Sequence, residues 1–175
     1  MTATRPEFRN AIGRVVTRWW KGLGDDRGTR ASLRRAGSIT EVFGIPGFHH
    51  DLLRPVEENL QRPVDDAEAE RLAVVAAVLA HVEQAVSGRS SPAAFGRYLG
   101  SSKKGEQPRI SGLRFRRLLA IDNQETLLRT MIRVVHLLDK TSPVVALASV
   151  LAGWDSDQTR RALAIEYYAA APKAA

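Results

Sequence analysis

The sequence contains no cysteine in 175 residues, which excludes disulfide bonds, thiolate nucleophiles and cysteine-based zinc sites. A reduced cytoplasm is the default compartment for such a chain, so we expect a cytoplasmic protein. The first ten residues carry two arginines and lack the apolar segment that signal peptides contain. Long apolar runs are missing as well, since none approaches the roughly 20 residues that cross a bilayer.

Convergent reactive groups are also scarce, although an enzyme needs several of them. The segment His49-His50-Asp51 lacks the i, i+4 spacing that lets two imidazoles of a helix reach one metal ion. Acidic pairs at positions 25–26, 65–66 and 155 with 157 stand where helices or turns are expected to begin, and capping explains them. We therefore expect no enzyme activity, no metal and no cofactor. The alternative is a magnesium-dependent nuclease that uses one of these acidic pairs.

Positive charge is what the chain has in excess. There are 26 Lys and Arg residues against 19 Asp and Glu, which gives a formal net charge of +7 and a sequence pI of about 10.4. Arginine supplies 21 of the 26 basic residues, and its guanidinium grips phosphate oxygens bidentately. A polyanion such as nucleic acid is the expected partner. The alternative interpretation is that the Ala- and Arg-rich composition reflects GC-rich coding.

Apolar residues recur at helical spacing over residues 8–23, 72–86 and 128–138, whereas sustained alternation with period two is absent. Asp65 with Glu68, and Asp122 with Glu125, resemble capping boxes that begin helices. The sequence therefore predicts an all-α fold. We expect two small helical bundles, residues 1–99 and 110–175, joined by a basic linker over residues 100–109.

The basic residues gather in clusters rather than alternating with acidic ones. Between positions 103 and 117 six basic residues accompany one acidic residue, so their repulsion is relieved only when an anion binds. Helices with Asn or Gln among their arginines are not apparent, which favours contacts to the phosphate backbone over base reading. The predicted nucleic-acid-binding residues are Arg27, Arg30, Arg34, Arg35, Lys103, Lys104, Arg109, Arg114, Arg116, Arg117, Arg129, Arg133 and Arg160.

The alternative for these clusters is a solvated surface whose arginines pair with acidic residues of the same chain, such as Glu57, Glu58 or Asp122. The two interpretations differ in what a charge reversal does. If the cluster binds phosphate, Arg34→Glu weakens nucleic acid binding and leaves thermal stability nearly unchanged, because an exposed charge contributes little to folding.

Several short motifs follow one another along the chain. They are Trp20-x-x-Leu23, Arg30-Ala31-Ser32-Leu33-Arg34-Arg35, Phe95-Gly96-Arg97-Tyr98-Leu99, Arg114-Phe115-Arg116-Arg117-Leu118-Leu119, the helix through Arg133, Trp154, and Arg160-Arg161 with Tyr167-Tyr168. In order and spacing these motifs resemble the CasB family, the small subunit of the type I-E CRISPR Cascade complex. The resemblance spans nearly the whole chain, although residues 38–90 carry little that matches.

This resemblance implies a two-bundle helical protein that pairs with a second copy of itself, beside other Cascade subunits, in a crRNA-guided antiviral complex. It would steady the guide–target duplex and the displaced DNA strand of the R-loop by sequence-nonspecific backbone contacts to crRNA and target DNA. The phosphate contacts that the resemblance implies are Arg30, Arg34, Arg35, Arg114, Arg116, Arg117, Arg129 and Arg133, whereas Lys103 and Lys104 rest on charge alone.

Two other functions fit a basic helical chain. A helix-turn-helix regulator would take its paired helices from residues 111–140 and prefer one duplex sequence. A protein–protein adaptor would use its charge for solubility and would bind no nucleic acid near physiological salt.

Overall fold

The computed structural model describes residues 5–102, 105 and 107–173. The predicted all-α class is confirmed: apart from two two-residue strands, the regular elements of these residues are helices. The helices are α1 (Pro6–Gly22), α2 (Arg27–Arg35), α3 (Ile39–Phe43), the π-helix η1 (Phe48–Leu53), α4 (Arg54–Leu60), α5 (Asp66–Ala80), α6 (Pro92–Gly100), α7 (Gly112–Leu119), α8 (Gln124–Leu137), α9 (Val144–Ala152) and α10 (Asp157–Ala170). Strands β1 (Gln84–Ala85) and β2 (Thr141–Ser142) pair in parallel.

The helix starts follow the side-chain chemistry of the sequence in one predicted case and depart from it in another. Asp65 and Glu68 form the predicted capping box at the start of α5. The box predicted at Asp122 is wrong, because Asn123 caps α8 by accepting from the Thr126 N–H at 2.8 Å. Glu125 instead accepts from the Ile39 N–H of α3 at 2.9 Å, so the tertiary fold has taken over its carboxylate.

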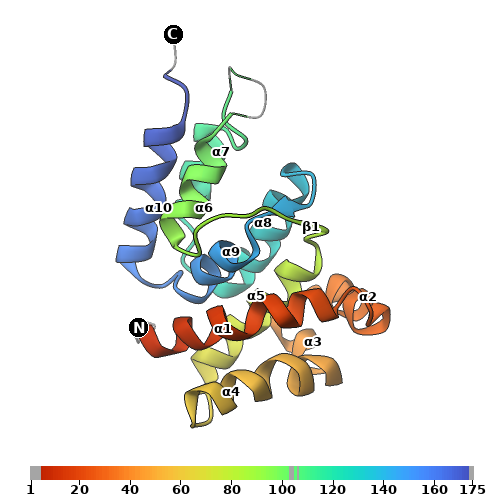
Figure 1. Cartoon of the computed structure of the whole chain (residues 1–175). Helices are drawn as coiled ribbons and strands as arrows, with labels where there is room; N and C mark the ends of the chain where they lie inside the picture. The colour runs from red at the N-terminus through yellow and green to blue at the C-terminus, as the bar shows by residue number, and fades with distance from the viewer. Residues whose placement is uncertain (1–4, 103–104, 106, 174–175) are drawn as a thin grey trace.

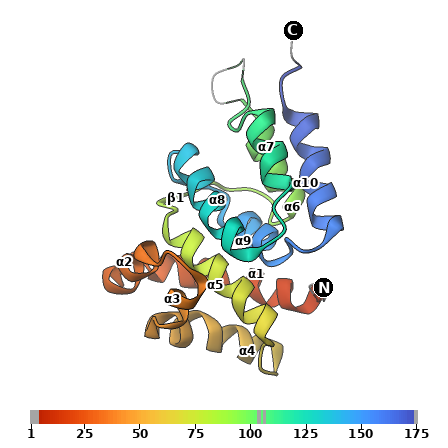
Figure 2. The same cartoon turned by 180° about the vertical axis from the view of Figure 1, so that it is seen from behind.

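Helix α5 is the centre of the molecule. Every residue from Arg71 to Ala80 is buried, which requires apolar neighbours on all sides of the helix. Helices α2 and α3 pack against it from one half of the chain, and α8 and α9 from the other. The two halves therefore share one hydrophobic core. Figures 1 and 2 show α6–α10 in the upper part of the molecule and α3 and α4 in the lower part, with α1 crossing α5 between them.

Helices α6 and α10 lie side by side at the upper edge of the molecule (Figures 1 and 2). Gly96 and Gly100 make this approach possible, since a Cβ at either position would collide with the backbone of Leu163 or Tyr167. An ion pair of 2.6 Å between Arg97 and Glu166 joins the exposed sides of the two helices. Helix α6 thus packs with the C-terminal helices.

The segment predicted as a linker closes on itself. Ser102 pairs with Pro108 in an antiparallel bridge, and the Ile110 N–H donates to the Leu99 carbonyl at 3.2 Å. Because α6 packs on α10, we propose that the bundles divide within residues 81–91 rather than at the predicted residues 100–109.

Candidate nucleic-acid interface

Two arginines of α2 are bound to the end of α5. The Nε atoms of Arg30 and Arg34 donate to the Ala80 carbonyl at 3.1 and 2.8 Å, and Arg30 also donates to the Val82 carbonyl. The Ala80 carbonyl belongs to the last turn of α5, whose carbonyls lack partners within the helix and carry the negative end of its dipole, and Val82 follows two residues after the helix. Arg30 and Arg34 therefore support the fold, and only their remaining donors face outward.

This arrangement corrects the expectation that Arg34 can be charge-reversed without cost to stability. The Arg34 side chain is 34% exposed, and its Nη2 forms an ion pair of 3.1 Å with Glu83. Burial, followed by repulsion from Arg34, lowers the pKa of Arg30, although a guanidinium stays protonated.

Glu83 connects α2 to the end of α8. Its Oε1 lies 3.0 Å from the Lys140 Nζ and 3.1 Å from the Arg34 Nη2. The hydrogen bond from Lys140 is the main cause that lowers the pKa of Glu83. One carboxylate thus holds two cations from opposite halves of the chain at fixed positions.

His81, between α5 and β1, lies at the meeting point of these charges. Its Nδ1 is 3.2 Å from the Nε2 of His136 on α8. Burial, and then the charges of His136, Arg34, Lys140 and Arg30, lower the pKa of His81 to about 4. His81 is therefore neutral at pH 7. The contact of His81 with His136, together with the ion pairs of Arg34 and Lys140 to Glu83, brings basic groups of α2 and of the end of α8 together here.

The exposed side of α8 continues this positive surface. Arg129, Arg133 and His136 follow one another at i, i+4 and i+7, opposite buried Leu128 and Val135. Arg129 forms a long, 3.7 Å ion pair with Glu125 and stays 60% exposed, whereas Arg133 has no partner among the described residues.

We call this surface the α2–α8 strip. It consists of Arg30, Arg34, Arg129, Arg133, His136 and Lys140. Figures 1 and 2 place α2 and the C-terminal ends of α5 and α8 along the same side of the molecule.

A second positive surface lies on α7. Arg114, Arg116 and Arg117 are exposed around the buried Phe115 and Leu118, and α7 contains no acidic residue. Within the part of the chain that the structure describes, these three guanidiniums have no hydrogen-bond or ion-pair partner. We call them the α7 cluster.

The other predicted contacts are scattered. Arg27 is exposed on α2, and Arg35 lies 3.5 Å from the Ser32 hydroxyl. Arg160 pairs with Asp157 at 3.2 Å. Lys103 and Lys104 lie outside the described residues.

Arg109 has partners within the chain, and its role as a phosphate contact stays a prediction. It donates to the Ser101 carbonyl and hydroxyl at 3.1 and 2.7 Å, and its guanidinium lies 4.6 Å from the Tyr98 ring centre. These contacts hold the turn after α6 in place.

The sequence profile of the family described as CRISPR-associated protein Cse2 matches residues 29–168. The chain belongs to the Cse2 family. This confirms the predicted resemblance to the CasB small-subunit family. A chain of the E. coli Cascade crystal structure bound to a PAM-containing dsDNA target is similar in fold, with a TM-score of 0.64 and 20% sequence identity, over 89% of this chain and 93% of that one. No curated protein matches the sequence.

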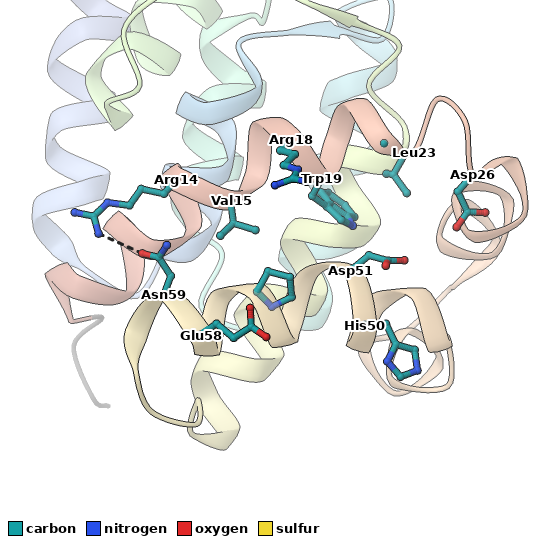
Figure 3. A pocket seen from close by; sticks show the side chains of 12 residues that line it. Arg14, Val15, Arg18, Trp19, Leu23, Asp26, His50, Asp51, Glu58 and Asn59 are labelled. Atoms are coloured by element: carbon teal, nitrogen blue, oxygen red, sulfur yellow. Dashed lines mark hydrogen bonds between the residues drawn. The ribbon is translucent and has the colours of Figure 1, made fainter.

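A groove of about 840 Å³ between α1 and the η1–α4 segment is a different kind of surface in this Cse2-family chain (Figure 3). Arg14 and Arg18 line its α1 side, while Asp51 and Glu58 line the other. Arg14 donates to the Asn59 side chain at 3.2 Å. Because charges of both signs face each other, the groove does not extend either positive surface.

Over the described ranges, no three His, Asp or Glu side chains gather closely enough to hold a metal ion. In the same residues, no helix is both long and apolar enough to span a membrane.

Sequence reasoning missed the junction at His81 and Glu83. Arg129, Arg133, His136 and Lys140 show helical spacing in the sequence, but nothing there indicates that this face meets α2. The meeting depends on both α2 and α8 packing against α5.

Proposed function

We propose that this chain is a non-catalytic, nucleic-acid-binding subunit of a crRNA-guided antiviral surveillance complex of the Cascade type. It contacts the backbones of crRNA and target DNA, and so stabilises the guide–target duplex and the displaced strand. Other Cascade subunits and a second copy of the chain are its protein partners. Membership of the Cse2 family supports the assembly. The observation that carries the binding mode is the convergence of α2 and α8 side chains in one positive strip.

The strip suits phosphates for a physical reason. Arg34 and Lys140 are held 3.1 and 3.0 Å from the same Glu83 oxygen, so two of its cations lose little conformational freedom when a strand binds. Each phosphate that is contacted releases condensed counterions, which is the main favourable term. Two exposed arginines of α8 add unneutralised or weakly neutralised charge beside them.

Backbone contact rather than base reading follows from the composition of α8. Its one amide side chain is Gln124, which donates to Asp155 at 3.1 Å and so is engaged within the protein. Arg129 and Arg133 remain, and without a neighbouring amide they provide charge more than a base-specific pattern. A helix-turn-helix regulator would instead prefer one duplex sequence strongly, and an adaptor would bind none.

The test is a Cascade-type complex assembled with crRNA but without its small subunit. Adding this chain should increase the affinity for target DNA, and the Arg129→Glu/Arg133→Glu variant should lower that gain about tenfold or more. The control is Arg54→Glu, which reverses one exposed charge on α4, a helix that Figures 1 and 2 show remote from α8. Equal behaviour of the two variants, or no gain from the wild-type chain, would contradict the proposal.

The non-catalytic part has a separate test. Purified protein incubated with single-stranded and duplex DNA and with RNA, in the presence of Mg²⁺ or Mn²⁺, should leave each substrate intact. Metal-dependent cleavage that disappears on substitution of the exposed Asp66 or Asp157 would show a nuclease instead.

A further inference from the structure

Two adjacent tyrosines near the end of α10 have very different surroundings. Tyr167 is buried: its ring stacks on Phe115 with centroids 3.8 Å apart, and its hydroxyl donates to the Ile110 carbonyl at 2.6 Å. Tyr168 is 53% exposed, and its hydroxyl has no hydrogen-bond partner in residues 5–102, 105 and 107–173. Folding therefore explains Tyr167 and leaves the Tyr168 ring without a comparable role.

The exposed ring is nevertheless held in place. Tyr168 stands perpendicular to both members of the stacked pair, with centroids 5.1 Å from Tyr167 and 5.9 Å from Phe115. Its distances to the two parallel rings are similar, so Tyr168 lies beside the stack and contacts both. A ring fixed on one side and open to solvent on the other loses little freedom when a flat partner covers it.

The ring also adjoins the α7 cluster. Along α7, Phe115 lies between Arg114 and Arg116, and Arg117 directly follows Arg116. A Cβ at Gly112 would lie 3.7 Å from the Arg116 Nη1 and 3.9 Å from the Tyr167 hydroxyl, so this guanidinium lies near the Tyr167 hydroxyl, and the Tyr167 ring in turn contacts Tyr168. An open aromatic ring next to unpaired guanidiniums combines the two features by which proteins hold single strands.

We propose that Tyr168 is a stacking site for an unpaired nucleic acid base, on a strand whose phosphates are bound by the α7 cluster. This rests on the proposed function and adds a ligand class to it. Bases of a duplex already stack on their neighbours and cannot also cover the ring. The α7 surface therefore favours single strands, and its preference is independent of sequence because every base has an aromatic face.

The experiment measures binding of the full-length protein at low ionic strength to three labelled ligands of equal length: a single strand, an abasic strand and a duplex. Tyr168→Ala should weaken binding of the single strand about tenfold, which is of the order expected for one stacked base. It should leave the abasic strand and the duplex unchanged. Tyr168→Phe keeps the ring and should bind all three like the wild type.

Three results would overturn the stacking site. They are equal losses on the normal and abasic strands, a loss in Tyr168→Phe as large as in Tyr168→Ala, and unchanged binding in both variants. Unchanged binding together with failure of Tyr168→Ala to enter the assembled complex would assign the ring to a protein contact. A wild-type protein that binds normal and abasic strands equally overturns the stacking site alone, whereas one that binds no strand, free or in the complex, overturns the proposed function too.

Discussion

The α2–α8 strip and the α7 cluster are built from the same type of residue but differ in what holds them. In the strip, Arg30 and Arg34 donate to the last carbonyls of α5, and Glu83 bridges to Lys140. In the α7 cluster, the guanidiniums are exposed and lack partners among the described residues. Arg30 and Arg34 of the strip therefore support the fold in addition to their proposed role in binding, whereas the exposed arginines of the cluster have only the proposed role in binding. The chain offers several ways to separate these roles.

The largest expected effect is a loss of stability when a buried arginine of α5 is removed. Arg71 on α5 is 6% exposed, and its Nε and Nη2 donate to the same Asp155 oxygen at 2.8 and 2.6 Å. Arg71→Ala leaves the Asp155 carboxylate partly buried without its cation, and should lower the free energy of unfolding by about 3 to 5 kcal/mol. Urea denaturation measures this, with Arg117→Ala as the exposed control. A loss below about 1 kcal/mol would show that burial does not decide how much an arginine contributes to the free energy of unfolding.

A smaller loss of stability is expected when Arg34 of the α2–α8 strip is removed. Arg34→Ala removes the donor to the Ala80 carbonyl and the ion pair with Glu83, and should lower the free energy of unfolding by about 1 to 3 kcal/mol. Arg34→Lys keeps the charge but lacks the planar donors, so it should recover only part of the loss. Thermal unfolding of both variants tests this. Full recovery by lysine would mean that charge, and not the hydrogen bond to α5, matters here.

The stability of the region around the α2–α8 strip should depend on pH, because His81 lies against it, whereas the α7 cluster contains no histidine. The pKa of His81 is lowered to about 4 in the folded protein, against about 6.5 in an unfolded chain. Between these two pH values the unfolded state binds the proton and the folded state does not. The free energy of unfolding is therefore unaffected by this histidine above pH 6.5 and falls as the pH drops towards 4. The loss should reach about 1 to 3 kcal/mol.

Denaturation at pH 7 and pH 5 measures this slope, and the control is His81→Gln, which cannot titrate. The charged groups facing His81 are His136, Arg34, Lys140 and Arg30, with Glu83 bound to two of them. Because those groups remain in the variant, an equal slope in wild type and His81→Gln would assign the pH dependence to them.

The contrast between the two surfaces also shows where sequence reasoning succeeds. Apolar spacing placed α1 and α8 correctly, because a buried helix face needs a recurring apolar side chain whatever its partner is. It also found α5, but the predicted continuation to residue 86 is wrong, since α5 ends at Ala80 and Gln84–Ala85 forms β1. The Asp65 capping box was predictable because it is complete within four residues. Contacts of short range are therefore visible in the sequence.

What depends on distant partners was not visible. Nothing near Arg30 or Arg34 shows that they end against α5, 46 or more positions away. Gly96 and Gly100 allow α6 and α10 to touch, which moves the proposed bundle boundary, but the sequence does not show which helix they meet. The number of arginines can be counted in the sequence. Which of them form hydrogen bonds and ion pairs within the fold cannot be read from it.

The smallest effect on stability, paired with a clear effect on binding, is expected at the α7 cluster. Arg116→Ala/Arg117→Ala removes two exposed guanidiniums with no partner in the described ranges, so the free energy of unfolding should change by less than about 0.5 kcal/mol. If both contact phosphates, the slope of log affinity against log salt should flatten by roughly 1.4 for a single strand and roughly 1.8 for a duplex. Titrations of wild type and variant at several salt concentrations measure the slope, with Arg54→Ala as a control that removes charge far from α7. An unchanged slope would confine phosphate binding to the strip, and a marked loss of stability would show that these arginines, like Arg34, are part of the fold.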